Sequence, residues 1–261
     1  MLKQMLNGIY QSRYFWWHLA LADLRAKYQR TSLGMMWSMI QPLAMTLLYG
    51  FVLTSIFHQP VVQSLIFIYS GIICWDLILF AAVSGTYAFI NAAPYLNQFP
   101  HPIAIYPLRV SLVGGINFLF AFLGFLGLVL ILNPNSISIT WLSIPIGIAL
   151  LLLTTWPIAI ICAIIGTIYR DLSQAITIFL QAIWFVSPVF FQPQVFINGH
   201  IEFLVYYNPL YHLLQLIRCP FIDGVFPSLI NYGVTVLLIL ALWIPAGYLL
   251  LRFNRRMILY V

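Results

Sequence analysis

Long runs of apolar residues dominate the chain, and short polar or proline-rich segments separate them. The runs do not alternate between apolar and polar positions, so they predict helices rather than strands. About 20 consecutive apolar residues are enough for a helix to cross the hydrocarbon core of a bilayer. We therefore predict six membrane spans, at residues 33–57, 62–88, 110–132, 141–168, 172–191 and 228–251.

A different pattern precedes the first run, within residues 13–30. On a helical wheel the aromatic and aliphatic residues share one face: Tyr14, Trp17, Leu21, Leu24 and Tyr28. The opposite face holds polar residues, and Asp23 and Lys27 have i,i+4 spacing for an ion pair. The pattern predicts a helix in the membrane interface, although a plain basic flank of the first span is the alternative. Residues 1–32 are then a cytoplasmic N-terminal part, and residues 33–261 form one membrane domain.

Composition supports an all-α integral membrane protein. Hydrophobic residues make up 63% of the 261 positions, and charged residues only 6%, against about 25% in soluble domains. The cations assigned to the cytoplasmic side are Lys3, Arg13, Arg25, Lys27, Arg30, Arg109, Arg170, Arg252, Arg255 and Arg256, which leaves Arg218 outside. This distribution predicts that both termini are cytoplasmic. It also explains the net charge of +6 by membrane topology, so no nucleic-acid partner is expected.

Asp76 is the one ionisable residue deep within a predicted span. An intramembrane acid is a functional candidate, because exposing it to lipid would cost about 3 kcal/mol or more. A structural role, near the outer end of a tilted helix or paired with a neighbouring helix, is the alternative. The three cysteines, Cys74, Cys162 and Cys219, lie in separate segments and have no spacing typical of a disulfide or a metal site.

The loop between the second and third spans is rich in proline and aromatic residues. Its prolines, Pro94, Pro100, Pro102 and Pro107, leave room for only a short helix near Tyr95–Phe99. On the predicted topology this loop is cytoplasmic. Its aromatic side chains favour a rigid docking point for a partner, with a plain connector as the alternative.

The outside segment from Ser187 to Pro227 is long yet mostly apolar. Asn208 is suited to cap a helix that has Pro209 at its first position. In this helix Leu210, Leu213, Leu214 and Ile217 form an apolar stripe, and His212, Gln215 and Arg218 lie off it. Such a helix is about 15 Å long, too short to span. It predicts a re-entrant helix at an outer gate, or a hairpin that rests on the membrane without gating.

Catalytic patterns are missing from the sequence. There is no GxxxxGK[ST] phosphate loop, and the five acids are scattered along the chain. This composition offers little material for acid–base or metal catalysis. We therefore predict a protein that is not an enzyme, with no cofactor and no metal of its own.

Four segments together resemble one known family. DLRAKYQRTSLGMMWSMIQPL, QFPHPIAIYPLRV, RDLSQ and YNPLYHLLQLIR are similar, in this order, to segments of the polysaccharide-export permeases of ABC transporters. His101 stands where that family usually has arginine. O-antigen exporters look closest, and exporters of capsular polysaccharide and teichoic acid are related alternatives.

The resemblance implies a homodimeric permease in the bacterial inner membrane. Two copies of a separate ATPase subunit would bind the ATP and Mg²⁺. The substrate would be an O-antigen polysaccharide linked to undecaprenyl pyrophosphate, and membrane lipids would surround the spans.

The resemblance also implies roles for particular residues. The ATPase-coupling segment would comprise Tyr95, Asn97, Gln98, Phe99 and His101. Cations of the interface helix, Arg25, Lys27 and Arg30, would bind anionic lipid or the pyrophosphate. Aromatic residues of the channel wall would include Trp37, Tyr49, Phe179, Trp184 and Phe185. Gln192–Ile197 and a second helix with Asn208, Pro209, Tyr211, His212 and Arg218 would form the outer gate.

Two other classes of protein are weighed against the permease. A membrane-embedded enzyme acting on polyprenyl-linked substrates would need acids or histidines clustered at one membrane face, which the sequence lacks. A secondary transporter usually needs several buried ionisable groups, and Asp76 alone supports that reading only weakly.

Overall fold

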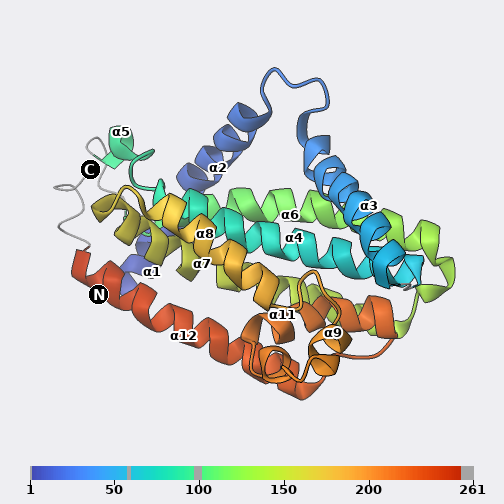
Figure 1. Cartoon of the computed structure of the whole chain (residues 1–261). Coiled ribbons are helices and arrows are strands. Elements are labelled where there is room, and N and C mark those ends of the chain that lie inside the picture. The colour runs from blue at the N-terminus through green and yellow to red at the C-terminus, as the bar shows by residue number, and fades with distance from the viewer. Residues whose placement is uncertain (1, 58–59, 97–101, 254–261) are drawn as a thin grey trace.

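The computed structural model describes residues 2–57, 60–96 and 102–253. Within these ranges the regular secondary structure is entirely helical. The bundle consists of α3 (Trp37–Phe57), α4 (Val61–Thr86), α6 (Ile105–Leu132), α7 (Ile144–Ile168), α8 (Leu172–Val186) and α12 (Leu229–Phe253). These helices run roughly lengthwise except for α3, which slants across α4 and α6 (Figure 1). All of them except α8 are long and apolar enough to cross a membrane. The chain is therefore a multi-pass membrane protein.

Helix α4 lies at the centre of the bundle. It packs against α3, α6, α7 and α8, and 78% of its most apolar window is buried inside the protein. Small residues allow its close approach to α7: a Cβ added at Gly166 would lie 2.7 Å from Thr86. Close packing through small residues holds helices together where lipid removes the hydrophobic driving force between them.

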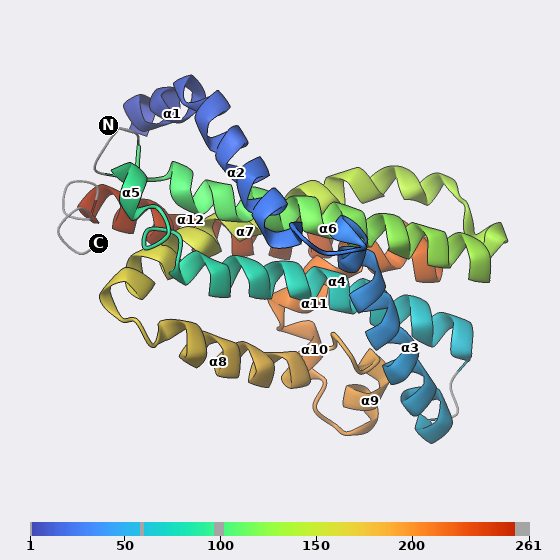
Figure 2. The ribbon, with the colours of Figure 1, turned by 90° about the horizontal axis from the view of Figure 1, so that it is seen from above.

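Helix α8 differs from the predicted span at residues 172–191. It ends at Val186 after 15 residues, so it is about 22 Å long, shorter than a hydrocarbon core. The cause is Pro188, because the residue before a proline avoids the helical region, and Ser187 is extended with ψ 148°. Apolar residues continue to Phe191 beyond this break, which is why hydropathy alone extends the span too far. Helix α8 still runs along the bundle (Figure 2).

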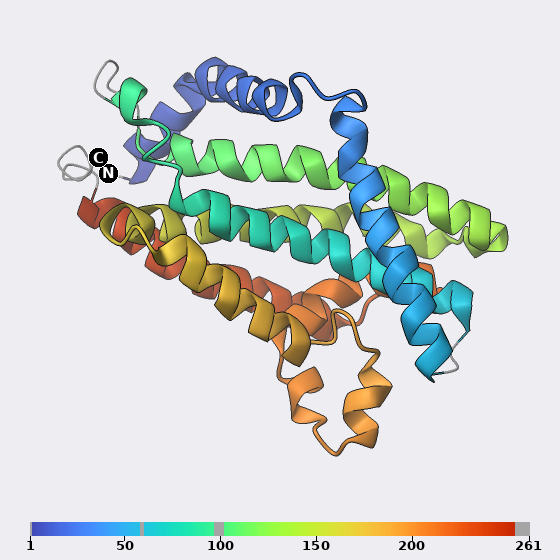
Figure 3. The ribbon, with the colours of Figure 1, turned by 45° about the horizontal axis from the view of Figure 1, so that its top comes forward.

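The bundle has two distinct ends. Helix α1 (Leu2–Gln11), helix α5 (Ala93–Leu96) and the last turn of α12 lie at one end, which we call the terminal end (Figure 3). The opposite, distal end holds α9 (Pro193–Asn198), α10 (Phe203–Tyr206), α11 (Pro209–Arg218) and a π-helical turn, Cys219–Asp223. Both α1 and α10 are additional to the helices that the sequence predicted.

The remaining boundaries follow local chemistry. Helix α6 begins at Ile105, five residues before the predicted start at 110, with Pro107 in its first turn, where a missing N–H costs little. Short 3₁₀ turns at Gly34–Met36 and Ile139–Ser143 precede α3 and α7. A short helix was predicted near Tyr95–Phe99; α5 (Ala93–Leu96) overlaps it at its first two residues, and residues 97–99 lie outside the described residues.

Candidate functional site

Helix α2 (Arg13–Tyr28) packs along α6. Its Ala20 and Leu24 are 0% and 4% exposed and contact a cluster that includes Val113 of α6. Tyr14 and Trp17, predicted to share the apolar face, are exposed instead. The face of α2 that packs against the rest of the chain is therefore not the face that carries Tyr14 and Trp17.

Asp23 is paired with α6 and not with Lys27. Arg109 donates from Nε to Asp23 Oδ2 and from Nη2 to Asp23 Oδ1, a two-point contact between α6 and α2. The predicted i,i+4 pair with Lys27 is wrong, because a guanidinium on the neighbouring helix can engage both carboxylate oxygens at once.

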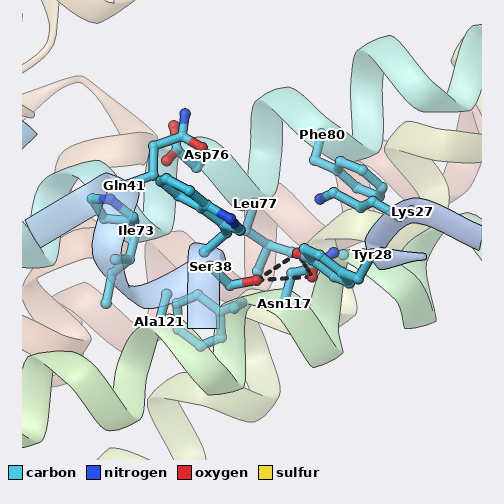
Figure 4. Close-up of a pocket in the computed structure, with 14 residues that line it drawn as sticks. Lys27, Tyr28, Ser38, Gln41, Ile73, Asp76, Leu77, Phe80, Asn117 and Ala121 are labelled. Atoms are coloured by element: carbon cyan, nitrogen blue, oxygen red, sulfur yellow. Dashed lines mark hydrogen bonds between the residues drawn. The ribbon is translucent and has the colours of Figure 1, made fainter. Parts of the chain in front are cut away.

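Beyond this ion pair, α2, α3, α4 and α6 enclose a hollow of about 190 Å³, here called the α2–α3 hollow (Figure 4). The Tyr28 hydroxyl donates to Asn117 Oδ1 at 2.6 Å and lies 2.6 Å from Ser38 Oγ. Lys27 Nζ lies 5.3 Å from the centre of the Phe80 ring. A cation and several uncharged polar groups therefore line a hollow in the side of an apolar bundle.

A second hollow, of about 240 Å³, lies between α3, α4 and α8 and is here called the α3–α8 hollow. Three aromatic residues, Tyr49, Trp75 and Trp184, line it. The polar residues in its wall are Gln41, Asp76, Thr177 and Gln181. Rings and hydrogen-bonding groups thus line one space.

Asp76 lines both hollows, together with Gln41 and Pro42. Its side chain is exposed, although its neighbours Trp75 and Leu77 are buried. In Figure 4 the Asp76 carboxylate lies beside Gln41, at the far end of the α2–α3 hollow from Tyr28. Asp76 is therefore positioned to meet a molecule in either hollow.

The predicted channel aromatics occupy three different environments. Tyr49 and Trp184 meet across the α3–α8 hollow with ring centres 6.2 Å apart. Trp37 lines the α2–α3 hollow, whereas Phe179 and Phe185 lie on the exposed surface of α8. Phe185 nevertheless packs edge-to-face on Trp184, with ring centres 5.2 Å apart, so the structure brings three of the five together.

Phe190 joins Tyr49 and Trp184, and the sequence analysis missed it. Its ring centre lies 5.0 Å from that of Tyr49 and 5.3 Å from that of Trp184. Phe190 follows Pro188, whose break at the end of α8 turns the chain back toward α3 and α4. A proline followed by two phenylalanines inside an apolar run was the available signal.

The predicted coupling segment is described only in part. Tyr95 packs edge-to-face on Phe15 of α2, with ring centres 6.0 Å apart. A Cβ added at Gly8 of α1 would lie 2.6 Å from Pro102, so the far side of the loop also contacts the N-terminal helices. Asn97, Gln98, Phe99 and His101 lie outside the described residues.

The three predicted lipid-binding cations do not converge. Lys27 lines the α2–α3 hollow. Arg25 is exposed beside His18 on another side of α2, and Arg30 lies in an exposed turn with φ 67°. Of the three, Lys27 alone reaches the α2–α3 hollow.

At the distal end, Asn208 caps α11 as predicted. Its Oδ1 accepts from the Leu210 backbone N–H at 3.0 Å, and Pro209 is the first helical residue. Its Nδ2 also donates to Ser187 Oγ at 2.7 Å. The same side chain thus begins α11 and ties it to the end of α8.

His212 and Arg218 are buried, at 6% and 1% exposure, whereas the sequence placed them off the apolar stripe of α11. His212 Nε2–H donates to the carbonyl of Tyr206 at 2.9 Å, and Nδ1 lies 2.9 Å from the Asn231 side chain on α12. Since helices α4, α7 and α12 surround α11, polar residues must also find partners inside the protein.

Arg218 links three segments of the chain. Its guanidinium donates to the carbonyls of Pro188 and Val189, each at 2.6 Å, and to that of Phe67 at 3.1 Å. It also lies over the Phe67 ring, 3.6 Å from its centre. Gly71 makes room for this arrangement, because a Cβ there would lie 2.4 Å from the Val189 carbonyl oxygen.

Among the described residues, no three His, Cys, Asp or Glu side chains gather as metal ligands would. The described site therefore consists of rings, amides, hydroxyls and single charges. Such groups bind and guide a molecule by stacking and hydrogen bonding.

Comparison with known proteins finds similar transport proteins. No family model matches the chain. An O-antigen export system permease protein of Klebsiella pneumoniae is 23% identical over 204 residues, covering 78% of each chain. One of Myxococcus xanthus is 24% identical over 191 residues, covering 72% of each chain. A polysialic acid transport protein of Escherichia coli is 22% identical over 238 residues, covering 84% of this chain and 83% of its own.

The apolar bundle is that of an integral membrane protein, and these relatives are named as transport proteins and not as enzymes. Over most of its length the chain is similar to O-antigen export permeases and polysialic acid transport proteins, so the resemblance of its motifs to polysaccharide-export permeases is confirmed.

Proposed function

We propose that this chain is the membrane subunit of an exporter that moves an O-antigen polysaccharide on undecaprenyl pyrophosphate across the bacterial inner membrane. The main observation in support is the α3–α8 hollow, where three aromatic residues and four polar side chains line one space in an apolar bundle. Aromatic rings stack on the C–H faces of sugars. Amides and carboxylates hydrogen-bond sugar hydroxyls, so such a wall supports a sliding glycan.

A homodimer fits this proposal. The faces of α3 and α8 that flank the hollow carry large exposed apolar side chains, among them Phe51 at 75% and Phe179 at 64%. A second copy packed on this face would shield the path from lipid. It would also bring Phe179 and Phe185 toward a shared channel.

The energy would come from two copies of a partner ATPase, which bind ATP and Mg²⁺. We assign docking to the segment from Tyr95 to His101. The contact between Tyr95 and Phe15 supports this assignment, because motion of the docked segment would pass directly to α2 and then, through Asp23 and Arg109, to α6.

On the same proposal both termini are cytoplasmic, and the interface-helix cations receive the lipid-linked substrate. Lys27 is the cation placed at a hollow, so it would contact the pyrophosphate there, with Arg25 and Arg30 attracting anionic lipid. Helix α11 and its neighbours would form the gate at the outer face.

A capsular polysaccharide is the second candidate substrate. The polysialic acid transport proteins align with this chain over 84% of its length, a longer stretch than the O-antigen permeases do. The α3–α8 hollow suits either polymer, because stacking and hydroxyl bonding do not depend on one sugar sequence.

The test is export in cells whose own copy of the gene is deleted. Tyr49→Ala with Trp184→Ala should stop glycan from reaching the surface and leave lipid-linked glycan in the cytoplasm. Tyr49→Phe with Trp184→Phe, which keep rings, serve as the matched control and should restore most export. Normal export by the double alanine variant, at equal protein level, would contradict the proposal.

A further inference from the structure

The distal end contains a third hollow, separate from the two described above. Its volume is about 370 Å³, within the range of small-ligand sites. The outer end of α4, the α9 region, Tyr206 of α10, helix α11 and the π-helical turn after it all contribute to its wall. We call it the distal hollow; of these helices, α9 and α10 project from the bundle in Figure 3.

The wall of the distal hollow is polar in a strongly apolar chain. Four of the twelve glutamines in the sequence line it: Gln63, Gln192, Gln194 and Gln215. Tyr206, Tyr211 and Asp223 add two phenols and one carboxyl group. Glutamines have no need to gather at one place for solubility alone, so this grouping points to a ligand.

The character of these groups selects the ligand. An amide side chain both donates and accepts hydrogen bonds, as a sugar hydroxyl does. Burial raises the pKa of Tyr211, so its phenol stays protonated and able to donate. The one cation, Arg218, is occupied by backbone carbonyls of Pro188, Val189 and Phe67, and this leaves an anion without a free positive partner.

The distal hollow also follows the α3–α8 hollow along α4. Tyr49 and Trp184 line the α3–α8 hollow and contact Phe190. Phe190 lines a narrow space of about 10 Å³ together with Phe67 and Gln192, which also line the distal hollow. The rings of Tyr49, Trp184 and Phe190, here called the aromatic cluster, therefore separate an inner hollow from an outer one.

We propose that the distal hollow is a binding site for a short, uncharged segment of a polysaccharide chain that has passed the aromatic cluster. This assignment rests on the proposed function. Holding the emerging chain outside the aromatic cluster would oppose its slipping back, because each bound segment must first leave the glutamine-lined wall.

The first experiment uses light-induced cross-linking during export in intact cells. Tyr206 lines the distal hollow, and the adjacent Tyr207, which is 86% exposed, does not. Photoreactive p-benzoylphenylalanine is placed at Tyr206 in one variant and at Tyr207 in the other. We expect glycan attached to the first variant and little or none to the second. Capture of a protein instead, or equal glycan capture at both positions, would overturn the assignment.

The second experiment measures binding by the purified permease in detergent. The probes are oligosaccharides of one to four repeat units, released by mild acid from the surface polysaccharide of the host. Gln63→Leu and Gln194→Leu change exposed side chains and should each weaken binding about five-fold. Gln29→Leu, an exposed glutamine at the far end of α2, is the control and should leave binding unchanged.

Unchanged oligosaccharide binding in the Gln63→Leu and Gln194→Leu variants would also overturn the assignment. Export by the unmodified chain, measured in the same cells, separates the two levels of inference. If export is normal and the distal hollow captures no glycan, the proposed function stands and this site falls. If the unmodified chain exports no glycan, both fall.

Discussion

Two arginines join distant helices at two places in this molecule, and they do so in different ways. Arg109 meets a carboxylate, Asp23, in a pair whose side chains are 13% and 33% exposed. Arg218 is 1% exposed and is held by three backbone carbonyls, by Ser70 Oγ at 3.3 Å and by the Phe67 ring. The first is a partly hydrated ion pair, and the second is a charge solvated by dipoles.

The difference follows from access to water. Near water an ion pair costs little to form and contributes little. In a dry interior a guanidinium stays charged, and several oriented carbonyls can replace its water. Since Pro188 ends α8, the carbonyls of Pro188 and Val189 are free of helix bonds and face Arg218. One side chain therefore holds α11, α4 and the end of α8 together. Replacing Arg218 should therefore lower the stability of the fold more than replacing Asp23.

The largest effect is expected for Arg218→Met. Removing the guanidinium leaves buried carbonyls without donors, at a cost of about 3 kcal/mol or more. The melting temperature of the detergent-purified protein, followed by tryptophan fluorescence, should fall sharply or the protein should fail to accumulate. Arg252→Met, at an exposed arginine of α12, is the control. A melting temperature equal to that of the unmodified chain would contradict the role of Arg218.

The next effect is expected for Gly71→Ala. Its new Cβ would lie 2.4 Å from the Val189 carbonyl and 2.6 Å from Arg218 Nη2, so the contact must open, at about 1–3 kcal/mol. Gly127→Ala, where a Cβ would meet nothing within 4 Å, is the matched control and should be neutral or slightly stabilising. Equal melting temperatures for the two variants would show that the contact of Arg218 with the Val189 carbonyl tolerates displacement.

Asn208→Ala should cost about 1 kcal/mol, because the first turn of α11 loses its cap. Asn208→Asp keeps an oxygen for the Leu210 N–H and loses the donation to Ser187 Oγ. Denaturation of the two variants therefore separates capping from the tie to α8. If both variants match the unmodified chain, neither bond contributes to the distal end.

The smallest effect is expected at the comparison pair, Asp23 and Arg109. A double-mutant cycle with Asp23→Asn and Arg109→Gln should give a coupling of about 0.2–1 kcal/mol. Added salt should weaken this coupling, whereas the stability lost in Arg218→Met should not depend on salt. A coupling as large as the effect of Arg218→Met would remove the contrast between the two sites.

Much of the fold was predictable because its signals are local. Apolar runs of sufficient length marked the helices that are long enough to span, and the charge-free stretch after Gly34 marked the first of them. Asn208 and Pro209 marked the start of α11 within a few residues. The end of α8 was also a local signal, at Pro188, but hydropathy averaged over a window hid it.

The site was predictable in residue type and less so in arrangement. Tyr49 and Trp184 were expected in an aromatic wall, and the structure places them around one hollow. Phe190 and the glutamines of the distal hollow were missed, because no spacing along the chain relates Gln63 to Gln194. Their proximity depends on how the chain brings α9 to the first turn of α4.

The sequence by itself determined that this is a helical membrane protein and that its motifs resemble those of polysaccharide-export permeases, because hydrophobic length and short motifs depend on neighbouring residues. Only the tertiary structure decided the partners of the charges. Asp23 had a plausible local partner in Lys27 and took Arg109, 86 positions away. Arg218 was assigned to the outside, off the apolar stripe of its helix, and it donates to Ser70, 148 positions away, since a buried guanidinium must donate to whichever oxygens the packed helices bring to it.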